Sequence, residues 1–131
     1  MTGDAPEGGD CSPDAAAGFG RLDAVGTYLV YRLSSWTARS WQHESASGRR
    51  TDLVVAAIQQ LADIGADAEA RPRRDVPSLP ADPPAGPGAG LTDQLAVMVG
   101  DVSASGDRAA AATATDILER LVRNLQLPRR R

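Results

Sequence analysis

The side chains of this sequence that could carry chemistry are few, and most of them stand apart from one another. His43 is the only histidine, and Glu44 follows it. Neighbouring residues on a helix point about 100° apart, so this pair does not converge on one metal ion, and no further ligands stand at a suitable spacing. The single cysteine, Cys11, lies among acidic residues, which disfavour the thiolate that a nucleophile needs. We therefore expect no metal, no cofactor and no catalytic residue.

One flank of the first predicted helix carries the residues best suited to a small ligand. Tyr28, Arg32 and Arg39 fall on that flank, and His43 lies nearer the apolar stripe. Two arginines at this spacing can grip a phosphate or a carboxylate while a tyrosine ring stacks on it. The alternative is an ordinary charged flank that pairs with acidic residues of another helix. A ligand-binding or enzymatic helical domain that uses these four residues therefore remains one candidate function.

Two carboxylates of the second predicted helix, Asp63 and Asp67, stand one turn apart. A carboxylate dyad that exchanges protons needs burial to separate its two pKa values. Both residues fall on the side opposite the apolar stripe of this helix, and Arg71 follows Asp67 by one turn. We therefore interpret them as solvated surface acids, with Arg71 as the expected partner of Asp67.

Four amphipathic segments must position these side chains, and we expect each of them to be a helix. Apolar residues recur within each segment at steps of three and four, the spacing of one helical face. The predicted helices cover about residues 19–42, 51–70, 92–104 and 107–127. Asp107 is the expected N-cap of the last helix, because its carboxylate can accept from a free amide of the first turn.

A stretch rich in proline and glycine, residues 71–90, separates the two pairs of predicted helices. Six of the nine prolines lie between Pro72 and Pro87. An extended segment of this length spans about 60 Å, whereas a helix of about 20 residues is only about 30 Å long. The connector can therefore cross the full length of a bundle or pass one helix pair to a partner chain. At the two ends, we expect residues 1–18 to be a disordered acidic tail and residues 128–131 a basic tail.

The predicted fold is therefore all-α. Two helical hairpins, joined by the long connector, close into a four-helix bundle either within one chain or across a dimer. No segment shows the sustained alternation of a strand.

Several apolar residues fall outside the core stripes of the predicted helices. On the first helix, Val30 and Trp41 lie at the side of the stripe, and Tyr31 points away from it. Val97 points outward on the third helix, and Val122 lies at an edge of the stripe on the fourth. Tyrosine and tryptophan are typical anchors of protein contacts, although single exposed apolar residues are also ordinary. We expect these five residues to form an interface with a second copy or another protein.

The charge balance favours a protein partner over a nucleic acid. The formal net charge is −3, which provides no general attraction to a polyanion. Arginines at 71–74 and 129–131 leave a nucleic-acid-associated protein as a second alternative. The run Val25–Leu33 is too short to span a bilayer, so we expect a cytoplasmic protein without membrane contact. The favoured function is a non-enzymatic, self-associating interaction protein that serves as an adaptor, regulatory or accessory subunit.

Overall fold

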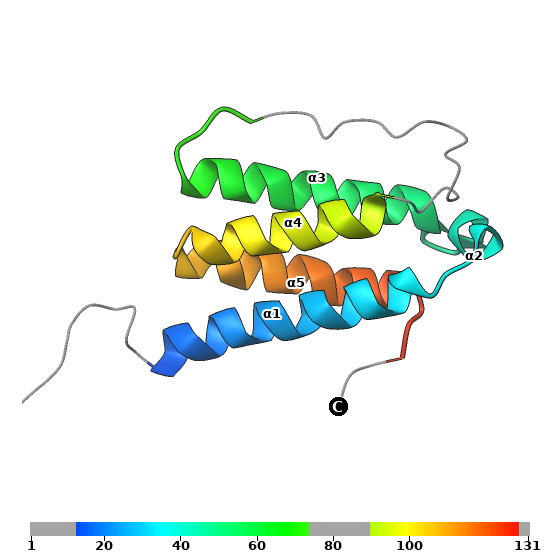
Figure 1. Ribbon diagram of the computed structural model, residues 1–131, viewed down its shortest axis with the longest axis horizontal. Helices are drawn as coiled ribbons and strands as arrows, with labels where there is room; N and C mark the ends of the chain where they lie inside the picture. The colour runs from blue at the N-terminus through cyan, green and yellow to red at the C-terminus, as the bar shows by residue number, and fades with distance from the viewer. Residues whose placement is uncertain (1–12, 74–89, 129–131) are drawn as a thin grey trace, which may run out of the picture.

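Helices dominate the chain, as the all-α prediction requires. The structure is a computed structural model that describes residues 13–73 and 90–128, with the backbone alone for residues 13–17. Its elements are α1 (Pro13–Ser34), α2 (Ala38–Gln42), β1 (Glu44–Ser45), β2 (Gly48–Arg49), α3 (Arg50–Ala68), α4 (Leu91–Ala104) and α5 (Arg108–Asn124). Figure 1 shows four long helices lying roughly along one direction, with α2 at one end. No described helix is long and apolar enough to cross a bilayer.

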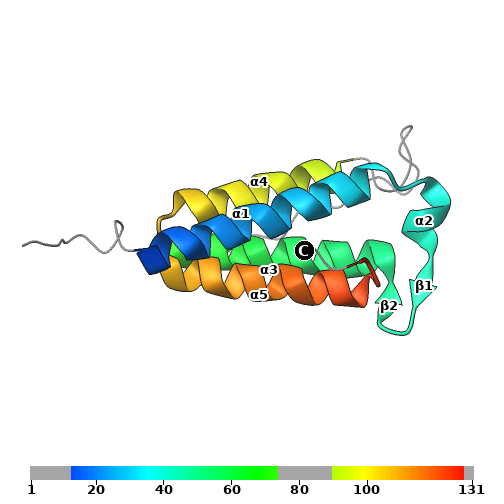
Figure 2. The ribbon, with the colours of Figure 1, turned by 90° about the horizontal axis from the view of Figure 1, so that it is seen from below.

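The long helices pack chiefly against helices from the other half of the chain. Both α1 and α3 contact α4 and α5. Figures 1 and 2 together show α1 and α3 on opposite sides, with α4 and α5 between them. The predicted hairpin of the first two long helices therefore does not form as a directly packed pair. Residues 35–49 fold into α2 and the β1–β2 hairpin, and this wide connection holds α1 and α3 apart.

The helices α3 and α4 run in the same direction, so the end of α3 and the start of α4 lie at opposite ends of the molecule (Figure 1). Most of the predicted connector, residues 74–89, lies outside the described residues, as do residues 1–12 and 129–131. The predicted tail 1–18 is too long at its C-terminal end, because α1 already begins at Pro13. Proline suits the first turn of a helix, and the alanines that follow are strong helix formers.

The first helix ends earlier than its apolar spacing predicts, and this corrects the expected range 19–42. The hydroxyl of Ser34 donates to the carbonyl of Val30 at 2.6 Å, and that of Ser35 donates to the carbonyl of Arg32 at 2.8 Å. Such side-chain bonds compete with the helical ladder. The chain then restarts as α2, where Thr37 is the N-cap and its side chain accepts from the amide of Ser40.

Residues 35–50, which we call the end cap, cover one end of the helices. The rings of Trp36 and Trp41 pack edge to face, with centroids 4.9 Å apart and an interplanar angle of 79°. The guanidinium of Arg50 lies 4.6 Å from the centroid of the Trp36 ring. The hydroxyl of Thr51 donates to the carbonyl of Trp41 at 2.8 Å. Aromatic packing and these polar contacts thus fix α2 on the start of α3.

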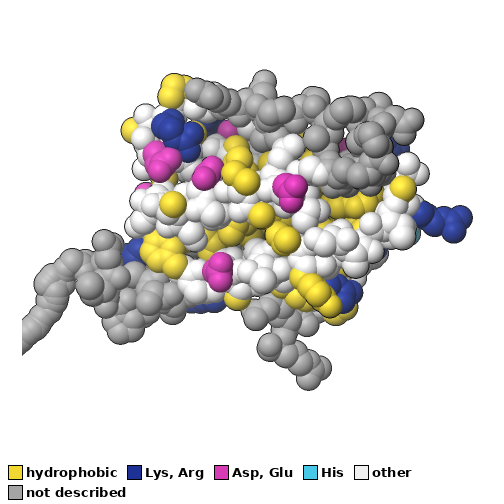
Figure 3. Space-filling model, viewed as in Figure 1, with side chains coloured by type: hydrophobic (Ala, Val, Ile, Leu, Met, Phe, Trp, Pro, Cys, Tyr) yellow, Lys and Arg dark blue, Asp and Glu magenta, His cyan; other side chains and the backbone are white. Residues whose placement is uncertain are grey.

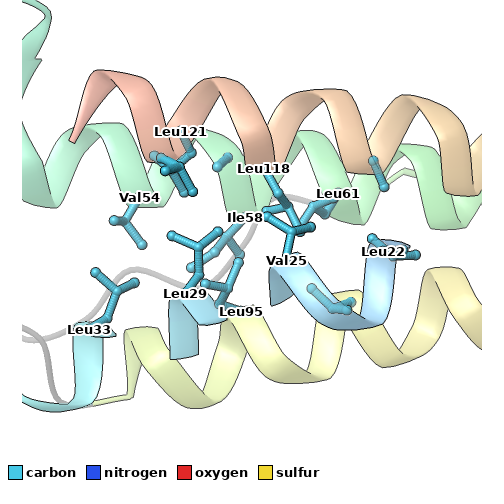
Figure 4. Packing of buried hydrophobic residues seen from close by; sticks show 14 of the residues in the cluster. Leu22, Val25, Leu29, Leu33, Val54, Ile58, Leu61, Leu95, Leu118 and Leu121 are labelled. Carbon is cyan, nitrogen blue, oxygen red and sulfur yellow. The ribbon is translucent and has the colours of Figure 1, made fainter. Parts of the chain in front are cut away.

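The core lies between all four long helices, and it is made mainly of leucine, isoleucine, valine and alanine (Figure 4). Leu29 of α1, Ile58 of α3 and Leu118 of α5 are fully buried. The apolar stripes predicted from the sequence supply most of this core. On α5, Leu118 is fully buried, whereas the neighbouring Ile117 is only half-buried.

The helix ends are fixed by local hydrogen bonds. The predicted N-cap is confirmed, because a carboxylate oxygen of Asp107 accepts from the amide of Ala110 at 3.0 Å. The helix α4 begins at Leu91, one residue before the expected start. Ala70 and Gln126 adopt φ angles of 54° and 60°, the left-handed conformation that commonly ends a helix. The chain therefore turns sharply after α3 and after α5.

Candidate interaction surface

The helices α1 and α4 pack tightly at a glycine, Gly26 of α1. A Cβ atom added at Gly26 would lie 2.9 Å from Cγ1 of Val99 and 3.3 Å from its Cγ2. Only a residue without a side chain permits this spacing of the two backbones. Because Gly26 has no side chain, the molecular surface is recessed along the seam where α1 meets α4.

A surface groove of about 410 Å³ follows this seam, and we call it the α1/α4 groove. Gly26, Val99, Ala96 and Gly100 line it together with Val30. The polar side chains that line the groove come from α1 and from the last turn of α4. A groove with this mixture of apolar surface and a few polar groups is suited to binding a side chain of another molecule.

The two most exposed large apolar residues among those described lie on the two helices that form the groove. Tyr31 is 74% exposed and lines the groove, and Val97 of α4 is 55% exposed. Val30 is half-buried beside Tyr31. Figure 3, which views this side of the molecule, shows hydrophobic side chains over α4 and α1. Of the five predicted interface residues, Val30 and Tyr31 thus line the groove together, and Val97 is exposed on α4, the other helix of the groove.

Charge is distributed unevenly around α1. Asp23 lines the groove, whereas Arg32 lies over the ring of Tyr28, 6.0 Å from its centroid. The helix α4 carries Asp93 and Asp101 and no basic residue. Among the described residues, the charged side chain that lines the groove is therefore an acidic one, Asp23.

The other two predicted interface residues are not available for contact, and we correct both. Trp41 is 3% exposed, because α1 ends at Ser34 and the turn into α2 directs its ring onto the end of the helices. Val122 is 7% exposed, because α5 packs against both α1 and α3 and so buries the edge of its stripe. Both residues belong to the hydrophobic core.

The predicted ligand flank is not assembled into a site. Tyr28 and Arg32 are half-buried on α1, whereas Arg39 of α2 and His43, its C-cap, are exposed on the end cap. Among these four, the only interaction within the described residues is the contact between Arg32 and Tyr28. The Tyr28 hydroxyl donates to the carbonyl of Pro128, which ties the chain after α5 to α1. None of the four lines the α1/α4 groove.

The carboxylates of α3 are surface groups, as expected, but their partner differs. Arg73 contacts Asp67 at 2.6 Å and Asp63 at 4.0 Å, while Arg71 contacts Glu69 at 2.8 Å. The predicted pair of Asp67 with Arg71 is therefore wrong, because the left-handed turn at Ala70 brings Arg73 back along α3. The hydrogen bond from Arg73 holds the pKa of Asp67 below its ordinary value, and the pKa of Arg73 is raised in return.

We expect the Arg73→Gln variant to raise the pKa of Asp67 towards the ordinary aspartate value of about 3.9. Because the folded-state pKa of Asp67 is lowered, the contribution of this pair to stability is present above the ordinary value and is lost as the pH falls through the lowered pKa. Carboxyl chemical shifts in an NMR titration measure the change. The matched control is Arg71→Gln, which should leave the pKa of Asp67 unaltered. If the pKa of Asp67 rose in Arg71→Gln and not in Arg73→Gln, Asp67 would be paired with Arg71, as predicted from the sequence.

No group of three or more histidine, cysteine, aspartate or glutamate side chains suited to a metal ion occurs among the residues that the structure describes. Comparison with family models, with curated proteins and with solved structures gave no match to the chain. Among the described residues, the feature that indicates a function is the exposed surface of α1 and α4 with the groove, Val30, Tyr31 and Val97, which we call the α1/α4 face.

Proposed function

We propose that this chain is a non-enzymatic interaction protein, an adaptor, regulatory or accessory subunit, which self-associates through the α1/α4 face. In this proposal the long helices form a four-helix bundle closed within one chain. The bundle acts as a rigid support for that face. The observation that carries the proposal is the exposure of Tyr31 and Val97 beside the α1/α4 groove. Tyrosine in particular provides a large contact area with few rotatable bonds.

The two alternative functions receive less support from the described residues. A ligand site on the flank of α1 would need Arg39 and His43 near Tyr28, and these side chains stand on different elements. A nucleic-acid surface would need free arginines near the end of α3, and there Arg71 and Arg73 each contact a carboxylate. Contacts to phosphates favour arginines that are not already paired with acids.

We expect wild-type protein to show a concentration-dependent increase in mass by size-exclusion chromatography with light scattering, and the double variant Tyr31→Ser/Val97→Ser to remain monomeric. Loss of these two apolar contacts removes the centre of the proposed interface. The matched control is Val55→Ser, because Val55 is also exposed, at 40%, but lies on α3.

Circular dichroism of each variant shows whether the helices are retained. A monomeric wild-type protein that also recovers no partner in a crosslinked affinity purification would contradict the proposal. Equal loss of association in Val55→Ser would place the contact elsewhere.

A further inference from the structure

We infer that the α1/α4 groove receives the Tyr31 side chain of a second copy of this chain, in a contact with two-fold symmetry. This inference rests on the proposed function and specifies how two copies meet. A two-fold interface requires that one face carry both a protruding group and the recess that accepts it. Tyr31 protrudes and the groove lies beside it on the same face.

The polar groups of the groove match a tyrosine. Its lining combines apolar surface with the Asp23 carboxylate and the hydroxyls of Thr27 and Ser103. A phenol can place its apolar ring against the apolar surface of the groove and donate its O–H to a carboxylate or hydroxyl oxygen. Within the described residues Asp23 has neither an ion pair nor a hydrogen bond from a side chain, so its carboxylate is free to accept one.

Gly100 leaves space where a ring would have to enter. A Cβ added there meets no atom within 4 Å, in contrast to the crowded position at Gly26. Glycine inside a helix is destabilising relative to alanine, and no packing among the described residues requires it at this position. The missing side chain at Gly100 therefore leaves room for a group that approaches the groove from outside the described residues, such as a ring from a second copy.

The size of the face is sufficient for a weak dimer. The 14 residues of α4 make a helix about 21 Å long, and two adjacent helices are about 20 Å wide. Side chains increase the accessible area above this projected area, so two copies would bury about 1,000 Å² in total. That value is near the lower limit for specific interfaces.

The charge of the α1/α4 face predicts opposite effects of salt on the binding of a second copy and on the binding of a basic partner. Asp23 lines the groove and Asp93 lies in the first turn of α4, so two copies that meet along α1 and α4 would bring carboxylates closer together. Added salt screens this repulsion and should tighten the association of two copies, whereas it would weaken the binding of a basic peptide. The salt dependence of the mass measurement therefore tests the occupant.

The contact itself is tested by crosslinking full-length chains in which Cys11 is replaced by serine. A Tyr31→Cys chain is mixed with a larger, tagged Gly100→Cys chain and treated with a short bis-maleimide. We expect a covalent product of the mixed mass, and much less product when Ala112→Cys of α5 replaces Gly100→Cys. A dimer that crosslinks equally in both mixtures would overturn the inference and leave the proposed function standing.

A second variant tests the groove without disturbing the interior. In the Gly100→Gln variant, the new side chain occupies the groove at a position where glycine leaves it empty. We expect this variant to associate more weakly by about tenfold or more, with an unchanged or higher melting temperature. The matched control is Ala112→Gln, which should associate like the wild type. A Gly100→Gln chain that associates normally, or a wild-type monomer that instead captures a different protein in a Tyr31-dependent way, would overturn the inference. The latter result would still support an interaction protein.

Discussion

We expect the Trp41→Ala variant to lose about 3–5 kcal/mol of its free energy of unfolding, the cost of deleting a large aromatic side chain from a core. Trp41 is 3% exposed and its ring packs on that of Trp36. Its removal also leaves the Trp36 ring without its edge-to-face neighbour and loosens α2 from α3. Urea unfolding followed by circular dichroism measures the loss, because the signal does not depend on the deleted indole.

The matched control for this prediction is Tyr31→Ala. Tyr31 is also aromatic but is 74% exposed, so its removal should change the unfolding free energy of the monomer by less than about 0.5 kcal/mol. The two variants thus distinguish an aromatic residue that stabilises the fold from one that contacts a second copy. A Trp41→Ala chain of normal stability that failed to self-associate would return Trp41 to the interface and contradict the structure of the end cap.

The sequence was sufficient to predict helices and most of the core, because apolar spacing reports directly on which side of a helix is buried. It failed at Trp41 because the helical angle was carried through residues 34–37, where the side chains of Ser34 and Ser35 bond to the backbone as the helix ends. It failed at Val122 because the width of the buried side depends on how many neighbours a helix has. That number follows from the tertiary arrangement and not from the period of one segment.

The candidate surface was predictable only in part. Tyr31 and Val97 point away from their stripes, and this is visible in the sequence. The groove between α1 and α4 depends on Gly26 meeting Val99, residues far apart in the chain, and on the antiparallel packing of the two helices. The same reasoning explains why the predicted ligand flank was not assembled. Its four residues share a flank only if one straight helix extends through His43.

The packing of α1 on α4 predicts that Gly26→Val lowers the free energy of unfolding by about 1–3 kcal/mol, the usual cost of overpacking. Val99 cannot turn aside easily, because a β-branched side chain in a helix is held in one preferred rotamer. The matched control is Gly20→Val in the same helix, where an added Cβ meets no atom within 4 Å. Chemical denaturation of both variants should show a loss only at Gly26.

A double-mutant cycle then assigns the loss to one contact. Val99→Ala removes both methyl groups that the new side chain would meet, so it should restore part of the stability lost in Gly26→Val even though it is destabilising alone. We expect the double variant to be more stable than the sum of the single changes by about 0.5–3 kcal/mol, the range found for residues in direct contact. Strict additivity would mean that α1 and α4 do not meet at these residues. In that case the groove above them, and the docking of Tyr31 into it, would lose their structural basis.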